Sequence, residues 1–435
     1  MDTPHPRQVL DLALAIGEIL LAEGMSASDL VASLTTVTKA YGIERAFFDV
    51  TYTQLSATCV PDLGETPITA FRMVHQRSLD FTRVRALDQL LQDIGQGMPF
   101  GDAVATFEAL RDAPAPYASG WTTIGDATLG AGVVLLFTTN WRDILLSFLI
   151  CLAISRLVRL LDAYEVPVLF QQGAGAAVAG LFAATAAELG RRDVWPFVGS
   201  TPALLVVGGV VVLVAGITAV GAVLDAIDEF YVTASARMFE TLMRTVGIVG
   251  GLLLGLRIAE AAGFAMTVRT DAIPLGPFPA QVLGAAMIAY GFALFAYADR
   301  TTRLLAATMG VTAWLSYSLA VFVGAGETVS NAIGALAATF ISTLIVRHTT
   351  VPSFALITAA LLPLVPGLAL YSGLLMTVGT TADTANVAGG SQGVLSALMV
   401  ALGIAAGASL GTFLGRPIAD RVRTRRRLSD ANPIS

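Results

Sequence analysis

Ten long apolar runs fill most of this chain from residue 118 onward, and they restrict its fold more than any other feature. Each run has about 20 residues, which is the length that an α-helix needs to cross the hydrocarbon core of a bilayer. A helix also satisfies its own backbone hydrogen bonds in that core, where water is absent. We therefore predict an all-α, multi-pass membrane domain with about ten transmembrane helices. The runs lie near residues 118–138, 143–161, 167–187, 203–223, 239–258, 278–298, 303–324, 329–346, 353–377 and 393–414.

The low content of charged residues agrees with this prediction. Asp, Glu, Lys and Arg make up 13% of the 435 residues, whereas a soluble domain has about 25%. The chain has a single lysine, Lys39, and it does not follow a glycine-rich loop. Because a Walker A loop needs a lysine to bind the nucleotide phosphates, ATP-driven pumping by this chain is not expected.

The first 115 residues are predicted to form a soluble α+β domain. Apolar residues recur at helical spacing near both ends of this segment, whereas its middle alternates and is rich in β-branched and aromatic residues. Predicted helices cover 8–23, 26–39, 83–94 and 101–112, and predicted strands cover 46–55, 56–60 and 67–74. The expected domains are a cytoplasmic domain at 1–115, two transmembrane units at 116–260 and 261–415, and a basic tail at 416–435.

The distribution of arginines predicts the orientation in the membrane. Ten spans place both termini on the same side, and that side receives more of the arginines, mostly from the tail. The first long apolar run begins near residue 118, so no export signal is expected ahead of the N-terminal domain. We therefore expect a multi-pass plasma-membrane protein whose N- and C-termini lie in the cytoplasm.

Two matching glycine ladders indicate an internal repeat. The fifth run has glycines at i, i+4 and i+8 in 247–255, and the tenth run has the same spacing in 403–411. Upstream, Leu204–Gly209 corresponds to Leu362–Gly367 at nearly the same offset. Since five is an odd number, two copies of a five-helix unit insert with opposite orientations. This pattern predicts two inverted five-helix repeats, an architecture common among secondary transporters.

Helix breaks are expected at corresponding positions of the two units. Gly208 and Gly209 can interrupt the fourth run, and Pro363, Pro366 and Gly367 can interrupt the ninth. Interrupted helices present backbone N–H and C=O groups to a cavity, where they bind substrate charges. Simple kinks are the alternative reading of these residues. Polar segments follow both breaks, and the one in the second half contains Asp383.

The segment after the first break carries an acidic cluster between apolar runs. Asp225, Asp228 and Glu229 would share one helical face if this segment is a helix. Each ionisable group costs about 2.5–3.5 kcal/mol at the centre of a membrane helix, so their clustering points to a functional site. Like charges packed in a low dielectric also raise the pKa of at least one carboxyl, as proton-coupled transport requires.

A second polar face continues along the same segment. Thr233, Arg237, Glu240 and Arg244 are spaced for one side of a helix, and Ser235 lies among them. Arg237, Glu240 and Arg244 can form a charge relay that offsets part of the cost of burial. The alternative is a solvated loop over 225–237 together with a structural ion pair. Asp126, in the first apolar run, is a weaker candidate for a polar group that faces the cavity.

No metal site or cofactor is expected from this sequence. The two cysteines, Cys59 and Cys151, are far apart, and the three histidines, His5, His75 and His348, are scattered. None of them has the spacing of a metal-binding motif.

The chain resembles the threonine/serine exporter family in three features. These are an N-terminal domain that opens with the helix Leu10–Gly24, the ten spans that follow it, and the run Phe230–Ile248; Leu364–Gly373 is also similar to the family. The resemblance covers nearly the whole chain. It implies export of threonine and serine, driven by the proton motive force, across a bacterial plasma membrane. Relatives that split the two halves into separate proteins are associated with succinate export.

The leading hypothesis is therefore a secondary exporter of small polar amino acids. Arg237, Arg244 or a half-helix N-terminus would bind the substrate carboxylate, and Asp225, Asp228 or Glu229 the ammonium. A dicarboxylate exporter is the alternative within transport. An intramembrane hydrolase that uses the aspartates is less favoured, because no Gly-x-Gly-Asp or His-Glu-x-x-His motif is present, and a receptor or channel is a third alternative.

The expected partners follow from the leading hypothesis. They are a small-molecule substrate, protons and the lipid bilayer, with a homo-oligomer possible and no nucleic acid. We expect the N-terminal domain to serve regulation or assembly, because it has no catalytic constellation.

Overall fold

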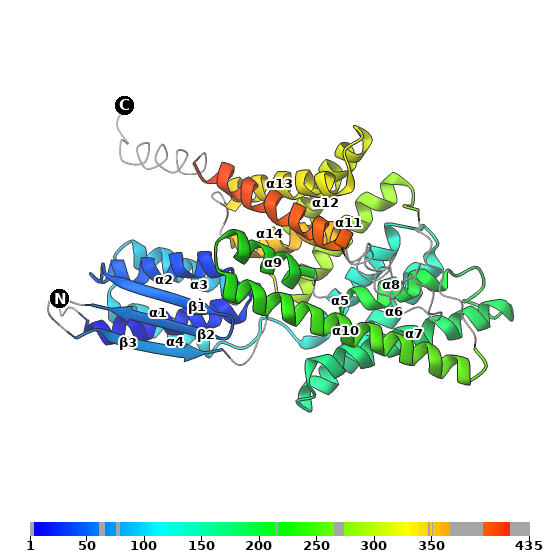
Figure 1. Ribbon diagram of the computed structural model, residues 1–435, viewed down its shortest axis with the longest axis horizontal. Coiled ribbons are helices and arrows are strands. Elements are labelled where there is room, and N and C mark those ends of the chain that lie inside the picture. The colour runs from blue at the N-terminus through cyan, green and yellow to red at the C-terminus, as the bar shows by residue number, and fades with distance from the viewer. Residues whose placement is uncertain are drawn as a thin grey trace.

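The computed structural model consists of an N-terminal α+β domain followed by a bundle of helices (Figure 1). It describes residues 4–60, 66–74, 79–213, 216–264, 274–346, 349, 351–365 and 395–417. The two parts lie at opposite ends of the long axis of the molecule, and the helices of the bundle run roughly along that axis.

The N-terminal domain contains a three-stranded antiparallel sheet with helices on one face. Its elements are α1 (Pro6–Ala22), α2 (Ala27–Ala40), β1 (Ala46–Thr51), β2 (Gln54–Cys59), β3 (Ile68–Met73), α3 (Phe81–Gly95) and α4 (Phe100–Arg111). β2 is the central strand. Val50, Leu55 and Cys59 point to the helical side and are buried. Gly17 lets α1 cross the sheet closely, since a Cβ there would collide with Leu55. The opposite face of the sheet is exposed.

One prediction for this domain is wrong. The strand expected over 46–55 is two strands, because a tight turn at Tyr52 and Thr53 separates β1 from β2. Tyr52 has a φ of 34°, in the left-handed region that favours turns. The turn pairs Thr51 with Gln54 and so fixes the register of the hairpin.

The bundle begins after a short segment with two prolines, Ala113–Tyr117. Its elements are α5 (Ser119–Leu135), α6 (Trp141–Ala163), α7 (Val168–Arg191), α8 (Pro202–Val211), α9 (Gly216–Ile227), α10 (Tyr231–Ala261), α11 (Phe278–Phe295), α12 (Arg300–Phe322), α13 (Glu327–Val346), α14 (Ser353–Leu361), a 3₁₀ turn (Leu362–Leu364) and the helix Leu395–Pro417.

Seven helices of the described part of the chain are long and apolar enough to cross a bilayer. These are α6, α7, α10, α11, α12, α13 and the helix Leu395–Pro417. α5 has 17 residues, the fourth apolar run folds as the shorter helices α8 and α9, and the described part of the ninth run, up to residue 365, contains the short helix α14. The multi-pass helical architecture is thus confirmed, whereas ten full-length spans are not.

The expected helix breaks are partly confirmed. Gly208 and Gly209 do not interrupt the fourth run, because both lie inside α8, where α6 side chains pack closely on them. The helix ends instead at Val211, and α9 begins at Gly216. In the ninth run, Pro363 lies in the 3₁₀ turn that ends α14. Pro366 and Gly367 lie outside the described residues.

The two glycine ladders have equivalent partners in the fold. In the first ladder, a Cβ at Gly251 would collide with the backbone of Gly173 in α7. In the second ladder, a Cβ at Gly407 would collide with the backbone of Ala332 in α13. Each ladder therefore packs on the third helix of its own half, α7 or α13. The contacting residues advance in the same direction along both helices, so each pair is parallel.

A third glycine contact joins the two halves. Gly125 of α5 faces Gly291 of α11, and Gly132 of α5 faces Gly284 of α11. The order of the contacts is reversed between the helices, so α5 and α11 are antiparallel. These are the first helices of the two expected five-helix units.

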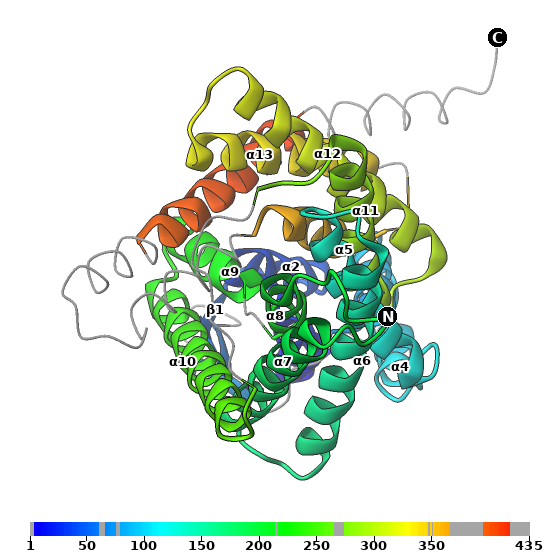
Figure 2. The ribbon, with the colours of Figure 1, turned by 90° about the vertical axis from the view of Figure 1, so that its right-hand side faces the viewer.

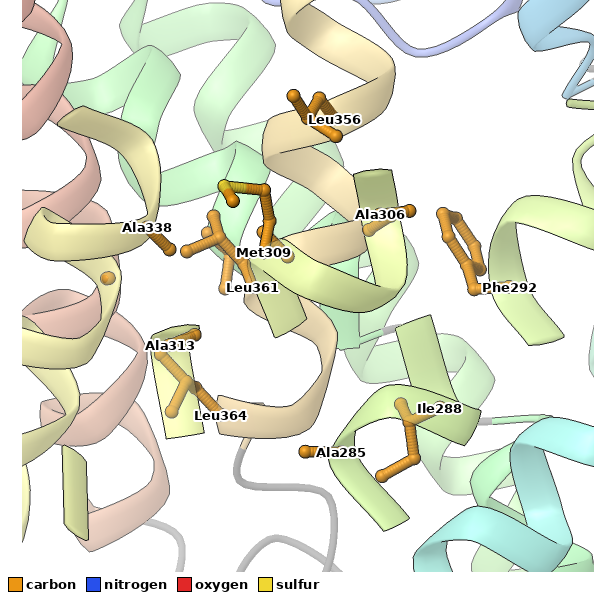
Figure 3. Packing of buried hydrophobic residues seen from close by; sticks show 14 of the residues in the cluster. Ala285, Ile288, Phe292, Ala306, Met309, Ala313, Ala338, Leu356, Leu361 and Leu364 are labelled. Carbon is orange, nitrogen blue, oxygen red and sulfur yellow. The ribbon is translucent and has the colours of Figure 1, made fainter. Parts of the chain in front are cut away.

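The centre of the bundle is filled by short helices and small apolar side chains. Viewed along the long axis, α8, α9 and α14 lie inside a ring of the longer helices (Figure 2). Figure 3 shows part of the core that α11, α12, α13 and α14 share, with Met309, Leu361 and Ala338 among its members. Large apolar side chains such as Phe239, Leu319 and Phe322 are exposed on the outside of the bundle, as expected for a surface that faces lipid.

The close contact of α10 with α7 predicts a position-specific effect of added volume. We expect Gly251→Ala to lower the stability of the protein by about 1–3 kcal/mol, the usual effect of overpacking, because its Cβ would meet the Gly173 backbone. Gly250→Ala is the matched control, since a Cβ there meets nothing within 4 Å. Thermal unfolding of both variants in detergent would measure the difference. Equal unfolding temperatures would contradict the packing.

Candidate functional site

A cavity of about 1390 Å³ lies between the N-terminal domain and the helical bundle. Side chains from α2 and α3 line it on one side, and side chains from α5, α6, α9, α10 and α14 line it on the other. Its charged lining includes the carboxylates of Glu23, Asp29, Asp88, Asp162 and Asp228 and the guanidinium groups of Arg159, Arg237, Arg244 and Arg416. The cavity can therefore hold a molecule that carries charges of both signs.

The acidic cluster lies at the edge of this cavity, at a corner between two helices. α9 ends at Ile227, Glu229 adopts a φ of 69°, and α10 begins at Tyr231. The expectation of one shared helical face for Asp225, Asp228 and Glu229 is therefore wrong. Asp225 is buried in α9, whereas Asp228 and Glu229 lie in the exposed turn. We call residues 225–231 the α9–α10 corner.

A buried ion pair joins this corner to the N-terminal domain. Nε of Arg237 lies 3.2 Å from Oδ2 of Asp225, and their side chains are 6% and 0% exposed. The other oxygen of Asp225 accepts a hydrogen bond from the backbone N–H of Ala27 (3.0 Å). Arg237 donates to the carbonyl of Met25 (2.9 Å). Ala27 is the first residue of α2, so the Asp225 carboxylate satisfies a free N–H at the positive end of that helix.

The sheet of the N-terminal domain binds the next turns of α10. The Thr233 hydroxyl donates to the carbonyl of Val50 (2.7 Å) and accepts from the N–H of Tyr52 (3.3 Å). The Tyr52 hydroxyl donates to the Glu240 carboxylate. Glu240 also pairs with Arg244 at 2.6 Å. Of the predicted relay of Arg237, Glu240 and Arg244, the structure shows the ion pair between Glu240 and Arg244. Arg237 pairs with Asp225.

A separate contact fixes the start of α3 to the second half of the bundle. Phe81 is buried between the rings of Phe292 and Phe354, with ring centres 5.9 and 6.1 Å away. Its backbone N–H donates to the carbonyl of Ala296 (2.8 Å), and Arg85 pairs with Asp299 at 3.1 Å. These residues could not be singled out from the sequence, because an aromatic residue at the start of a helix is ordinary in a soluble domain.

The remaining candidates occupy different places. Ser28 donates to Asp228, which lines the cavity. Ser235 is exposed and bonds the carbonyl of Val232. Asp126 is buried in α5 and accepts from the Ser155 hydroxyl at 2.5 Å. Pro366, Gly367 and Asp383 lie outside the described residues.

Two acidic side chains of the N-terminal domain also line the cavity, and they are not among the site residues predicted from the sequence. Asp88 of α3 and Asp29 of α2 both line the cavity. Burial, and to a lesser extent the negative charge of Asp29, raise the pKa of the Asp88 carboxyl. A cationic group between them would relieve this cost. Within the described residues, no three His, Cys, Asp or Glu side chains are grouped as a metal site requires.

Comparisons with known proteins give matches over most of the chain. Residues 11–259 match the family model described as “Putative threonine/serine exporter”, and residues 281–414 match “Threonine/Serine exporter, ThrE”. The chain is 32% identical over 431 residues to the “Probable threonine/serine exporter” of Mycobacterium tuberculosis, covering 96% of this chain and 78% of that protein. It is 30% identical over 380 residues to the “Threonine/serine exporter” of Corynebacterium glutamicum, covering 85% and 76%. No solved structure matches significantly.

The buried ion pair predicts unequal roles for the two aspartates of the corner. We expect Asp225→Asn to destabilise the protein by about 3–5 kcal/mol, because it leaves the Arg237 charge buried without the opposing carboxylate. Asp228→Asn should have an effect below about 1.5 kcal/mol, since it changes one exposed hydrogen bond. Thermal unfolding of the full chain in detergent would give both values. An Asp225→Asn variant as stable as the unmodified protein would show that the pair does not hold the domain.

Proposed function

Because the chain belongs to the threonine/serine exporter family, we propose that it exports threonine and serine across the plasma membrane, driven by the proton motive force. The observation that carries this proposal is the cavity between the N-terminal domain and the bundle, with charges of both signs in its lining. A free amino acid is a zwitterion, so it needs partners for a carboxylate and for an ammonium group.

The dimensions of the cavity support entry of a small hydrated substrate. Its volume of about 1390 Å³ exceeds the range of about 300–1,000 Å³ that is usual for small-molecule sites. We propose that it is the cytoplasmic vestibule of the carrier, from which threonine passes toward the short helices at the centre. The N-terminal domain and the end of the helix Leu395–Pro417 then face the cytoplasm together, since Arg416 pairs with Asp29 at 3.3 Å.

Different residues are proposed for binding and for holding the domain in place. Asp225, Arg237 and Thr233 already contact the N-terminal domain, so we assign them to docking. Arg244 is half-buried and lines the cavity, and we propose that it binds the substrate carboxylate. Asp228, together with Asp29 and Asp88, supplies negative charge for the ammonium group.

We further propose that the bundle is built from two inverted five-helix units. The antiparallel contact of α5 with α11 and the parallel pairs made by the two glycine ladders support this proposal. The short helices α8 and α14 hold the same place, fourth, in the order of the two units. Alternating access then arises from movement of one unit against the other around the centre.

Transport by the purified full chain in proteoliposomes tests the proposed function. We expect labelled threonine to move against its gradient when a pH gradient is imposed, and unlabelled serine to compete with it. Threonine flux that is the same with and without the pH gradient would contradict proton coupling. Competition by succinate and not by serine would contradict the amino-acid substrate and favour a dicarboxylate exporter.

A matched pair of arginines on α10 tests the proposed carboxylate partner. We expect Arg244→Gln to lower kcat/KM for threonine at least about tenfold, because a hydrogen bond to a charged group contributes about 1.5–3 kcal/mol. Arg257→Gln is the control, since Arg257 is an exposed residue of the same helix that pairs with Glu260. Initial rates of threonine flux in proteoliposomes measure both. Equal rates for the two variants would show that Arg244 does not bind the substrate carboxylate.

A further inference from the structure

A stripe of polar side chains runs along one face of α6 through the bundle. Asp143, Ser147, Cys151, Ser155 and Arg159 recur at every fourth residue, which places them on one side of the helix. The first four are buried. At about 1.5 Å per residue the stripe covers about 24 Å, most of the roughly 30 Å of a bilayer core. We call these five residues the α6 polar stripe.

Glycines hold the α6 polar stripe tightly against α5 and α8. A Cβ at Gly130 of α5 would collide with the Cys151 sulfur, and a Cβ at Gly208 of α8 would collide with the Ser147 hydroxyl. Ser147 donates to the carbonyl of Gly130 (3.2 Å), and Cys151 donates to the carbonyl of Gly208 (3.1 Å). Gly208 thus has a packing role that explains why it does not break α8.

The α6 polar stripe leads from the cavity to a buried carboxyl. Arg159 lines the cavity, and its Nη2 donates to the Ser155 hydroxyl at 3.1 Å. Ser155 in turn donates to Oδ2 of Asp126 at 2.5 Å. Asp126 itself is 6% exposed. Because an ionised side chain is costly inside a membrane, a carboxyl that is buried there commonly marks the path of an ion or proton.

Few charged groups face Asp126 from the helices around it. Arg159 and Cys151 of α6 are its ionisable neighbours. Asp126 is the one ionisable residue of α5, α8 has none, and α11 has only Tyr290, which lies under Arg303. Asp225, by contrast, is held by Arg237 and by the N–H of Ala27, so its charge is already compensated.

We infer that Asp126 is the carboxyl that carries the coupled proton, and that Ser155 and Arg159 connect it to the cytoplasmic cavity. This inference rests on the proposed function. Export driven by the proton motive force moves protons inward, so the proton arrives from the side of Asp143 and leaves through Ser155. In that step Asp126 gives its proton to the Ser155 oxygen, while the Ser155 hydroxyl releases its own proton to a water molecule that enters from the cavity beside Arg159.

The test compares two modes of threonine transport by the full chain in proteoliposomes. Net flux driven by a pH gradient needs proton release, whereas exchange of labelled for unlabelled threonine needs only substrate binding and alternating access. We expect Asp126→Asn to lower gradient-driven flux at least tenfold and to keep exchange within twofold of the unmodified protein. Thr123→Val is the control, because Thr123 is a buried polar residue of the same helix without an ionisable group; both of its activities should persist.

Each other outcome has a defined meaning. Gradient-driven flux that is unchanged in Asp126→Asn would overturn the inference, and so would loss of both transport modes in a variant that unfolds at the normal temperature. An unmodified protein that moves threonine without regard to the pH gradient would overturn proton coupling itself. If Asp126→Asn does not fold, Ser155→Ala takes its place. Because this variant lacks the hydroxyl that passes the proton on, it should lower gradient-driven flux at least tenfold and keep exchange within twofold of the unmodified protein. Unchanged gradient-driven flux would overturn the inference.

Discussion

The buried pair of Asp225 and Arg237 determines how the two parts of this protein fit together. Both side chains contact each other and also the backbone at the start of α2. A charge at the end of α9 would be costly on its own, and so would the free N–H groups at the start of a buried helix. The Asp225 carboxylate accepts a hydrogen bond from one of these N–H groups, and Arg237 neutralises its charge. The cavity between the domain and the bundle exists because this contact and the Phe81 contact hold the domain over the helices.

Much of the local structure was readable from the sequence because it follows from short-range patterns. The apolar runs predicted the helices, and the alternating segment predicted the sheet. The high cost of charge in a membrane protein correctly singled out residues 225–244 as unusual. The partners of those charges were not readable, because Ala27 and Tyr52 lie almost two hundred residues upstream. The alternative of a solvated loop over 225–237 is also wrong, because Asp225 is buried in α9 and Arg237 in α10, although an ion pair is present between them.

The glycines likewise show that a sequence pattern is readable, whereas the residues that contact it in the fold are not. Glycines at every fourth residue allow two helices to approach closely, and such contacts are present at Gly251 and Gly407. Spacing alone does not say which helix fills the groove. The prediction that Gly208 breaks a helix failed for a related reason, since the missing side chain makes room for Ser147 of a neighbouring helix. Asp126 was ranked below the corner residues because Ser155 and Arg159, which connect it to the cavity, become neighbours only in the folded bundle.

The contacts of the N-terminal domain reach both halves of the bundle. Ala27 binds Asp225 of α9, and Met25 and Val50 bind residues of α10. Phe81 and Arg85 bind residues that belong to α11, α14 and the loop before α12. The N-terminal domain is thus attached to both halves of the bundle at once. Any rotation of one half relative to the other must therefore break one of these attachments or carry the domain with a single half. Movement of one half against the other would therefore have to overcome the weaker of the two attachments.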